Sequence, residues 1–438
     1  MDDKNRSAQL FARGKRHIPD GVSSPLRSFR LVGGDPVVAR EACGARIHDV
    51  DDREYLDFLN GFGALILGHA HPEVVEAIRA QAGRGTSYGL ANEAEYQLAE
   101  RIVDSTPSLE AIRFVCSGTE AVMTATRIAR SHTGRSLILK FRGSYHGHSD
   151  ALLASPLNLE GGAAALKTVS RGITRQANRE VVLSEYNDVE EASRVFADHG
   201  DDIAAVVVEP HSTNMGFVKS RPEFIQALRD LTHQYGALLI FDEVVSGFRF
   251  NYGGISSQFG IDPDLTTFGK IIGGGTPVGA YGGKSLYLSH VAIGGGVFQS
   301  GTFAGNPLTT AAGNATLEIL SRPGFYERLD ALGADLQQRL EAGFAAHGIP
   351  YVVSRAGSVL GIAFRDAAVP MRNYRDVKTQ DYDTFTRFHQ RLRREGFLLA
   401  PSLEEPIFLS AAHTPTDLAR FADAAVHALR ELHAELNN

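Results

Sequence analysis

Short apolar runs alternate with stretches of helical periodicity through the middle of the chain, from about residue 56 to residue 320. The apolar runs are rich in Val, Ile, Leu and Phe, as expected for buried strands. They fall at Ile112–Val115, Leu137–Phe141, Ala204–Val208, Ala237–Phe241, Leu265–Phe268 and Val278–Tyr281. Helical patterns between them cover Glu120–Ser131, Val189–Ala197 and Pro222–Tyr235. This alternation predicts βαβ units and an α/β fold with a mainly parallel sheet.

The pattern changes after residue 320. A long amphipathic stretch is followed by three short strand-like runs and a closing helical pattern, which cover Tyr326–Ala345, Tyr351–Val353, Val359–Phe364, Pro406–Leu409 and Pro415–Leu436. Residues 1–55 combine a helical pattern at Ser7–Lys15 with turns and short strand candidates. We therefore predict a large domain over residues 56–320. A small α+β domain is expected from residues 321–438, with a contribution from residues 1–55.

Residues with functional side chains gather where the predicted strands end. Two kinds of cluster occur: Glu209, Asp242 and Lys270 each end an apolar run, whereas Ser117-Gly118-Thr119 and Tyr145-His146 each follow one. In open α/β sheets, ligands bind beyond the carboxyl ends of the strands. Because all these clusters fall at the same edge of the predicted sheet, we expect them to form one site.

Lys270 and Asp242 give this site a definite chemistry. Most lysines are solvated surface charges, but Lys270 stands between Phe268-Gly269 and Ile271-Ile272, a poor setting for a surface residue. Its amine would form a Schiff base and later act as the general base on a substrate proton. The Asp242 carboxylate would hold a protonated pyridine nitrogen, unless it caps a helix or pairs with Arg249. Together the two residues indicate pyridoxal 5′-phosphate as the cofactor.

Ser117, Gly118 and Thr119 begin the predicted helix Glu120–Ser131. The free N–H groups and the positive dipole end of a helix N-terminus can hold a phosphate. An ordinary N-cap is the simpler interpretation of these three residues alone. Their position at the same sheet edge as Lys270 favours phosphate binding.

The segment that follows Phe141 contains the run Tyr145-His146-Gly147-His148. Its tyrosine could stack on the cofactor ring. Its two histidines are not accompanied by a third and fourth ligand at the usual spacing, so we expect no metal. Glu209 and Asn214 are expected to reach the phenolic oxygen side of the cofactor.

Two other segments are candidates for anion contacts. Arg27 could grip a substrate carboxylate in bidentate fashion, or it could be an ordinary surface arginine. The polar, glycine-rich segment Gln299–Pro307 precedes a helical pattern at Leu308–Leu320 and is either a phosphate contact or a plain loop. The residues themselves leave both alternatives open.

Composition excludes several classes of function. The formal net charge of the 438 residues is −7 and no long basic run occurs, so nucleic acid is not an expected partner. No apolar stretch reaches the roughly 18 residues needed to cross a bilayer, and the polar N-terminus has no signal core. The two cysteines, Cys43 and Cys116, are too few for a disulfide framework and fit a reducing cytoplasm.

In combination, the motifs resemble those of the class III, fold-type I pyridoxal-phosphate enzymes over nearly the whole chain. Within that family the sequence looks most like glutamate-1-semialdehyde 2,1-aminomutase and its aminotransferase relatives. The matching segments are Cys116–Met123, Gly143–His148, Ile240–Val244, Thr267–Lys270 and Gly279–Gly283. The resemblance implies a large domain with a mainly parallel seven-stranded-type sheet flanked by helices, and a small α+β domain built from both termini.

The same resemblance implies roles for individual residues. Lys270 would be the Schiff-base lysine and Asp242 the partner of the pyridinium nitrogen. The other cofactor-binding residues would be Ser117, Gly118, Thr119, Tyr145, His146, Glu209, Asn214 and Val244. Thr302 would reach the phosphate bound by the neighbouring subunit, which implies a homodimer with shared active sites.

The chain also departs from the aminomutase pattern. The aminomutase gating loop has a Lys-Ala-Gly-Ser-Gly type of sequence, which is missing from Ala151–Lys167. A gate that retains the intermediate separates a mutase from a transaminase with the same first half-reaction. Features of the substrate end are partly kept, with Arg27 and with Glu405 in Ala400–Glu405 as tentative substrate residues. We therefore expect a family relative with an altered substrate.

Several functions are compatible with these residues. The leading hypothesis is an aminotransferase that moves an amino group from an amino acid donor to an oxo acid, aldehyde or ketone. The alternative is an aminomutase, which moves the amino group between neighbouring carbons of one substrate. A racemase or epimerase, or a non-catalytic protein that binds pyridoxal phosphate, comes after these. Residues 151–180 and the segment Ala367–Thr379 are expected to shape the acceptor pocket, whose substrate and stereochemistry stay open.

Overall fold

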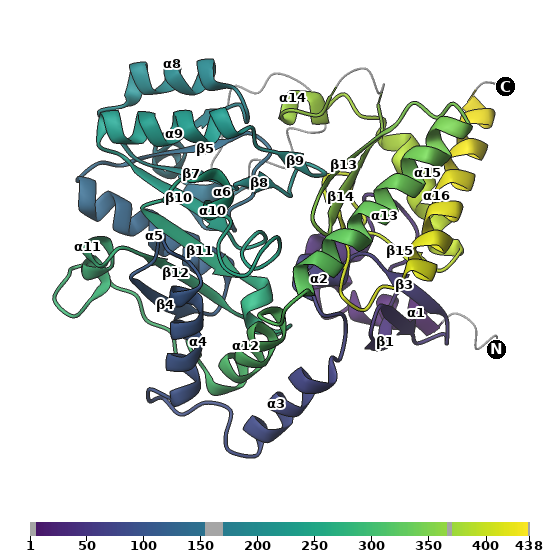
Figure 1. Ribbon diagram of the computed structural model, residues 1–438, viewed down its shortest axis with the longest axis horizontal. Coiled ribbons are helices and arrows are strands. Elements are labelled where there is room, and N and C mark those ends of the chain that lie inside the picture. The colour runs from purple at the N-terminus through teal and green to yellow at the C-terminus, as the bar shows by residue number, and fades with distance from the viewer. Residues whose placement is uncertain (1–5, 154–169, 366–369, 437–438) are drawn as a thin grey trace.

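A seven-stranded mixed sheet forms the centre of the described chain (Figure 1). The computed structural model describes residues 6–153, 170–365 and 370–436. All neighbouring strands run parallel except β12, which is antiparallel to both of its neighbours. In spatial order the strands are β4 (Ala111–Val115), β12 (Gly279–Gly283), β11 (Leu265–Gly269), β10 (Leu238–Glu243), β7 (Ile203–Val208), β5 (Leu137–Phe141) and β6 (Val181–Ser184). The predicted α/β fold with a mainly parallel sheet is confirmed.

The central strands β7, β10 and β11 are buried along their whole length. Helices on both faces of a parallel sheet explain why such strands are continuous apolar runs without alternation. The sequence pattern does not predict β6, because this four-residue edge strand has two half-buried positions and a weak apolar signal. β12 is antiparallel because only residues 270–278 connect it to β11, too few for a helical crossover.

Three helices that flank the sheet begin and end within two residues of the prediction. They are α5 (Gly118–Thr133), α8 (Val189–His199) and α9 (Pro222–Tyr235). Ala121, Ala125 and Ile128 of α5 recur at helical spacing and share one apolar cluster with Val207 and Ile240 of the sheet. In the described part of the chain, no helix combines the length and apolar character needed to span a membrane.

A second sheet joins the two ends of the chain. Its strands are β1 (Ala39–Cys43), β2 (Arg46–Asp49), β3 (Glu54–Asp57) and β15 (Phe397–Leu398), and β15 pairs in parallel with β3. One apolar cluster contains Phe58 from the N-terminal region together with Leu336 and Phe421 from the C-terminal region. This shared core agrees with a small unit built from both termini, and the exact boundaries at residues 55 and 320 stay a prediction.

Further helices and strands complete the two parts. Around the shared core lie the helices α1 (Arg6–Gly14), α13 (Phe325–Ala346), α15 (Tyr382–Arg394) and α16 (Pro415–Leu436), and the strands β13 (Val352–Ala356), β14 (Val359–Ala363) and β16 (Ile407–Phe408). Below the central sheet in Figure 1 lie α3 (Pro72–Ala82), α4 (Glu93–Asp104) and α12 (Pro307–Leu320). The sequence pattern does not predict α15, because the charged face of this helix hides its narrow apolar stripe.

Arg249 ties these parts together and gives a stability prediction. It is fully buried, and its guanidinium donates to the carbonyl oxygens of Gly63 and Leu409 (3.1 Å) and to Ser358 Oγ (3.4 Å). Arg249→Met would leave those carbonyl groups unpaired. Since each buried unpaired group costs about 1–3 kcal/mol, we expect the free energy of unfolding to fall by about 2–5 kcal/mol in urea. The exposed Arg40→Met control should change it by less than about 1 kcal/mol. Equal losses in both variants would contradict this linking role.

Candidate active site

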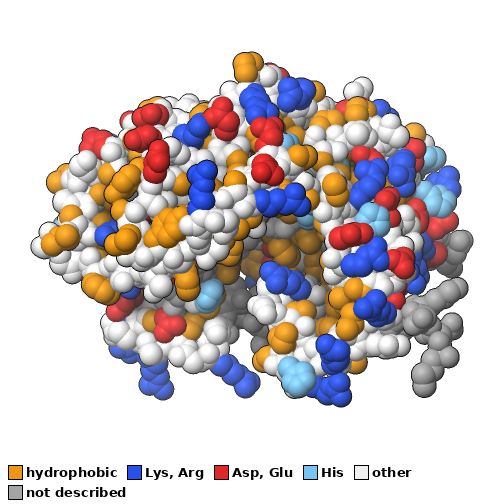
Figure 2. Space-filling model, turned by 90° about the horizontal axis from the view of Figure 1, so that it is seen from below, with side chains coloured by type: hydrophobic (Ala, Val, Ile, Leu, Met, Phe, Trp, Pro, Cys, Tyr) orange, Lys and Arg blue, Asp and Glu red, His pale blue; other side chains and the backbone are white. Residues whose placement is uncertain are grey.

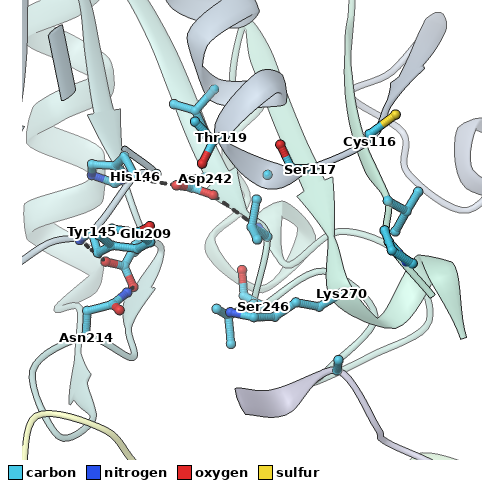
Figure 3. Close-up of a pocket in the computed structure, with 18 of the residues that line it drawn as sticks. Cys116, Ser117, Thr119, Tyr145, His146, Glu209, Asn214, Asp242, Ser246 and Lys270 are labelled. Carbon is cyan, nitrogen blue, oxygen red and sulfur yellow. Dashed lines mark hydrogen bonds and ion pairs between the residues drawn. The ribbon is translucent and has the colours of Figure 1, made fainter. Parts of the chain in front are cut away.

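A cavity of about 410 Å³ opens at the carboxyl edge of the central sheet (Figure 3). Its wall contains residues that end or follow β4, β5, β7, β10 and β11. These residues lie at the edge of the sheet where the sequence predicts a ligand site. The polar side chains that line it are Cys116, Ser117, Thr119, Tyr145, His146, Glu209, His211, Asn214, Asp242, Ser246, Lys270 and Thr276. Gly118 and Val244 also line it. Of the cofactor-binding residues predicted from the sequence, all except Thr302 therefore meet in one place.

Lys270 follows β11 directly and points into this cavity (Figure 3). Its backbone φ is 48°, a left-handed conformation that is uncommon for a residue with a side chain. Strain of this kind is concentrated at functional sites. Burial lowers the pKa of the Lys270 amine, while the charges of Glu405, Asp242 and Glu209 act in the opposite direction. The amine has no hydrogen-bond partner among the described residues, so it is free to bond to a ligand.

Asp242 lies near the end of β10 with both carboxylate oxygens fixed. Its Oδ1 accepts hydrogen bonds from the Val244 N–H (3.1 Å) and from Thr267 Oγ1 (3.2 Å). Parallel pairing of β10 with β11 sets Thr267 directly opposite Asp242. The alternative partner considered from the sequence, Arg249, donates to backbone carbonyls instead. A buried carboxylate held in this way can present its charge to a ligand in one orientation.

His146 supports Asp242 from the loop after β5. Its Nδ1 lies 2.6 Å from Asp242 Oδ2, an ion pair when the ring is protonated. Its buried Nε2 has no partner within the described residues. A buried polar atom without a partner is costly unless a ligand or a water meets it. The histidine thus has one nitrogen committed to Asp242 and one left for another group.

The first turn of α5 forms another part of the cavity wall. Ser117 is the N-cap residue, and its Oγ accepts from the Glu120 N–H (3.2 Å), so the simple capping interpretation holds for this side chain. Capping and anion binding are compatible, because a helix start has four N–H groups without intrahelical partners. A Cβ on Gly118 would approach Val244 Cγ1 to 2.9 Å, so only glycine lets the turn pack here. The turn therefore offers N–H groups and the Thr119 hydroxyl to an anion.

Tyr145, Glu209 and Asn214 lie together on one side of the cavity (Figure 3). Glu209 accepts hydrogen bonds from the Tyr145 N–H (3.3 Å) and from Asn214 Nδ2 (3.0 Å). Burial raises the pKa of Glu209, and the nearby His146 opposes that shift. The Tyr145 side chain stays 52% exposed, so one ring face is available for stacking on a ligand.

Three predicted residues lie outside the cavity wall. Arg27 is exposed on the 3-10 turn η3 (Pro25–Ser28), and Thr302 is exposed ahead of α12. Glu405 does not line the cavity, although its charge acts on Lys270 and on Tyr145. The structure thus joins the predicted cofactor residues except Thr302, whereas the tentative substrate residues Arg27 and Glu405 do not line the cavity.

The structure gives no support for the prediction that two further segments shape the acceptor pocket. Of residues 151–180, residues 154–169 lie outside the described residues, and the described ones do not line the cavity. Of the segment Ala367–Thr379, the described residues do not line the cavity. Its helix α14 (Tyr374–Val377) docks on the buried Glu185, which accepts from the Tyr374 N–H (2.9 Å).

The sequence predicted no role for several residues that line the cavity, among them Cys116, His211 and Ser246. Each stands within a few residues of a predicted strand end, and that position was the available signal. Burial lowers the pKa of His211 to about 4, so the ring is neutral at physiological pH. Its Nδ1 accepts from the Ser220 N–H (3.3 Å), which fixes the orientation of the ring.

Glu243, next to Asp242, gives a second stability prediction. It is fully buried; its Oε2 accepts from the Ile255 N–H (2.8 Å), and burial raises its pKa to about 8. Because the folded state holds this proton up to about pH 8 and the unfolded state releases it near its ordinary pKa, stability is lost as pH rises between these values. The slope from this group is about 1.4 kcal/mol per pH unit.

Glu243→Gln should remove that slope. Urea unfolding at several pH values is the measurement, and the wild type should lose stability relative to the variant as pH rises. Glu341→Gln, on the exposed face of α13, is the matched control and should keep the wild-type slope. Parallel pH profiles for the wild type and Glu243→Gln would show that Glu243 ionises at an ordinary pH.

The cavity combines four features that suit one kind of ligand. Lys270 supplies a free amine, and Asp242 supplies a fixed carboxylate. The first turn of α5 offers an anion site, and Tyr145 offers an exposed aromatic ring. Lys270 would react with an aldehyde, and Asp242 would hold a pyridine nitrogen. The first turn of α5 would bind a phosphate, and Tyr145 would stack on a planar ring. Fold and site together therefore define an α/β enzyme built for a phosphorylated pyridine aldehyde.

Comparison with known proteins leads to the same class. Residues 32–425 match the family Aminotransferase class-III. The chain is 44% identical to glutamate-1-semialdehyde 2,1-aminomutase 2 of Brevibacillus brevis, with 98% of this chain and 99% of the relative covered. It is 46% identical to the glutamate-1-semialdehyde 2,1-aminomutase of Thermomicrobium roseum, over 97% and 98% of the two chains. An omega-transaminase from Sphaerobacter thermophilus superposes with a TM-score of 0.91 at 35% identity, over 99% of both chains. The chain belongs to the class-III aminotransferase family.

Proposed function

We propose that this protein is an aminomutase, which moves an amino group between neighbouring carbons of one substrate. Relatives that are 44–46% identical over nearly the whole chain bear the name glutamate-1-semialdehyde 2,1-aminomutase. Their names favour the alternative hypothesis from the sequence over the leading one. The observation that supports amino-group chemistry is the Lys270 amine, which has no hydrogen-bond partner among the described residues and shares one cavity with Asp242.

As a class-III enzyme, the protein uses pyridoxal 5′-phosphate as its cofactor. When bound, this cofactor supplies a ring that withdraws electrons from a substrate carbon. Lys270 would be its covalent attachment point, and Asp242 would hold the ring nitrogen. Ser117, Gly118 and Thr119 would hold the phosphate by the N-terminus of α5. Tyr145 would stack on the ring, while Glu209 and Asn214 would face the phenolic oxygen.

Lys270 would also move the substrate proton. Its lowered pKa keeps more of the amine in the neutral form that accepts a proton near neutral pH. Asp242 would keep the ring nitrogen protonated, because an adjacent carboxylate favours the charged form. His146 would hold Asp242 in its orientation through the 2.6 Å contact. Arg27 and Glu405 remain candidates for the substrate end.

An aminotransferase is the second candidate, and two observations favour it. The sequence over 151–167 lacks the Lys-Ala-Gly-Ser-Gly type of gate. An omega-transaminase also has a closely similar fold. A transaminase needs no gate, because the first product leaves before the acceptor binds.

One experiment separates the two candidates. The cofactor-loaded protein is mixed with a panel of amino acid donors, and absorbance and free oxo acid are recorded. In parallel, the pyridoxamine form is mixed with glutamate-1-semialdehyde, and the isomer carrying nitrogen on carbon 1 is assayed. Isomer formation without oxo-acid release supports the aminomutase. Stoichiometric oxo-acid release from common donors, with no isomer formed, would replace the aminomutase by a transaminase.

We further propose a homodimer, based on an exposed apolar face made of Leu90, Tyr96, Phe298 and Phe303. The Asn92 side chain donates to the carbonyl of Gly305, so the two segments that carry these residues adjoin. Hydrophobic side chains also stand among charged ones over the side of the molecule seen in Figure 2. Large exposed apolar patches mark association sites in soluble proteins.

Sedimentation analysis tests this association. The wild type should sediment as a dimer, and Leu90→Asp combined with Phe303→Asp should sediment as a monomer. Leu31→Asp, a half-exposed leucine outside this apolar face, is the control and should stay dimeric. A monomeric wild type would rule the dimer out.

We also propose a cytoplasmic location, since Cys43 and Cys116 are both free thiols.

A further inference from the structure

His132 and His290 lie side by side on the surface, and neither lines the cavity. His132 is in the last turn of α5, and His290 is in the 3-10 turn η6 (Ser289–Val291). His132 Nδ1 lies 3.3 Å from His290 Nε2, whereas the ring centroids are 5.4 Å apart. Because the two nitrogens are much closer than the ring centres, the rings direct these nitrogens toward each other.

This separation suits a shared metal ion. Zn²⁺ binds histidine nitrogens at about 2.0–2.1 Å, and a tetrahedral angle then holds two such nitrogens about 3.3–3.4 Å apart. The observed 3.3 Å therefore needs little adjustment of either ring. Among the described residues, neither of the two nitrogens has another hydrogen-bond partner.

The surrounding side chains hold both rings in place. Ser131 Oγ lies 3.0 Å from His290 Nδ1, so it can accept the proton on that nitrogen and leave Nε2 free for a metal. His132 packs edge-on against the Tyr287 ring with centroids 4.9 Å apart. The Tyr287 hydroxyl in turn donates to Asp264 Oδ1 (3.0 Å).

We propose that His132 and His290 form a binding site for a divalent transition-metal ion such as Zn²⁺. Within the described residues no third His, Cys, Asp or Glu completes a ligand group, so water would fill the remaining positions. The bound ion would tie the end of α5 to η6. Since α5 begins at the cavity with Ser117 and Gly118, the site would fix the far end of the helix that borders it.

Calorimetric titration of the cofactor-loaded protein with ZnCl₂ tests the site. We expect saturable binding of one Zn²⁺ per chain, and a loss of affinity of at least about 10-fold in His132→Ala and in His290→Ala. Ser131→Ala should weaken binding less than either. His199→Ala is the matched control, because His199 likewise ends a helix but has no histidine neighbour among the described residues. All variants should keep the cofactor absorbance of the wild type, which verifies that they are folded.

A tetrahedral absorption band from Co²⁺, present in the wild type and absent from both histidine variants, would identify the ligands directly. Zn²⁺ affinities that are equal in the wild type, His132→Ala and His290→Ala would overturn the proposal, because any binding would then be adventitious. The absence of saturable Zn²⁺ binding in the wild type would overturn it as well.

Discussion

Lys270→Ala is expected to lower turnover by about 10⁴-fold. The variant loses the amine that would attach the cofactor and move the substrate proton, and the general-base role alone is worth about 10²–10⁴-fold. The fold should be retained, since alanine removes an amine that has no hydrogen-bond partner among the described residues. Turnover and the absorbance of the lysine-bound cofactor are the two measurements.

Lys284→Ala is the matched control for this substitution. Lys284 is an exposed lysine that follows β12, so its removal should leave both turnover and absorbance unchanged. If Lys270→Ala retained wild-type turnover, the assignment of Lys270 as the reactive lysine would be wrong. Cofactor that stays bound with unchanged activity in Lys270→Ala would contradict the catalytic proposal as a whole.

Asp242→Asn is expected to have the next largest effect. Asparagine can keep the hydrogen bond from the Val244 N–H, but it loses the charge that His146 contacts at 2.6 Å. An adjacent carboxylate raises the pKa of a ring nitrogen by about 1–3 units, and each unit corresponds to about tenfold in an equilibrium. We therefore expect turnover to fall by about 10–10³-fold, and the nitrogen pKa of the bound cofactor to fall with it.

A spectroscopic pH titration of the bound cofactor separates this electrostatic effect from simple loss of structure. Asp262→Asn, at an exposed position before β11, serves as the control and should leave the titration unchanged. Asp242→Glu should recover part of the turnover because it restores the charge. A titration curve of Asp242→Asn that overlies the wild-type curve would mean that Asp242 does not act on the ring nitrogen.

Much of the fold follows from local patterns. The helix α9 begins and ends at Pro222 and Tyr235, as predicted, because a proline start and a glycine stop bracket a regular apolar spacing. The strands β7 and β10 are equally easy to predict from the sequence, because burial on both faces requires unbroken apolar runs. β6 and α15 were missed because their apolar signals are short or narrow, and only neighbouring elements stabilise them.

The candidate site was predictable for a related reason. Each functional residue stands at a strand end or a helix start, and the carboxyl ends of parallel strands meet at one edge of the sheet. What the pattern does not provide is the contact between side chains distant in sequence. His146 and Asp242 are 96 residues apart, and their contact depends on the packing of β5, β7 and β10.

The sequence by itself determined the alternation of strands and helices and the family, and it indicated Lys270 and Asp242 as the proposed reactive pair. These are properties of local spacing and residue chemistry. Only the tertiary structure decided the antiparallel insertion of β12, the orphan Nε2 of His146, and the burial of Arg249 against Gly63 and Leu409. It also brought His132 to His290. The physical reason is that strand order and the contacts between helix ends depend on which distant surfaces exclude water together, and local periodicity carries no information about that choice.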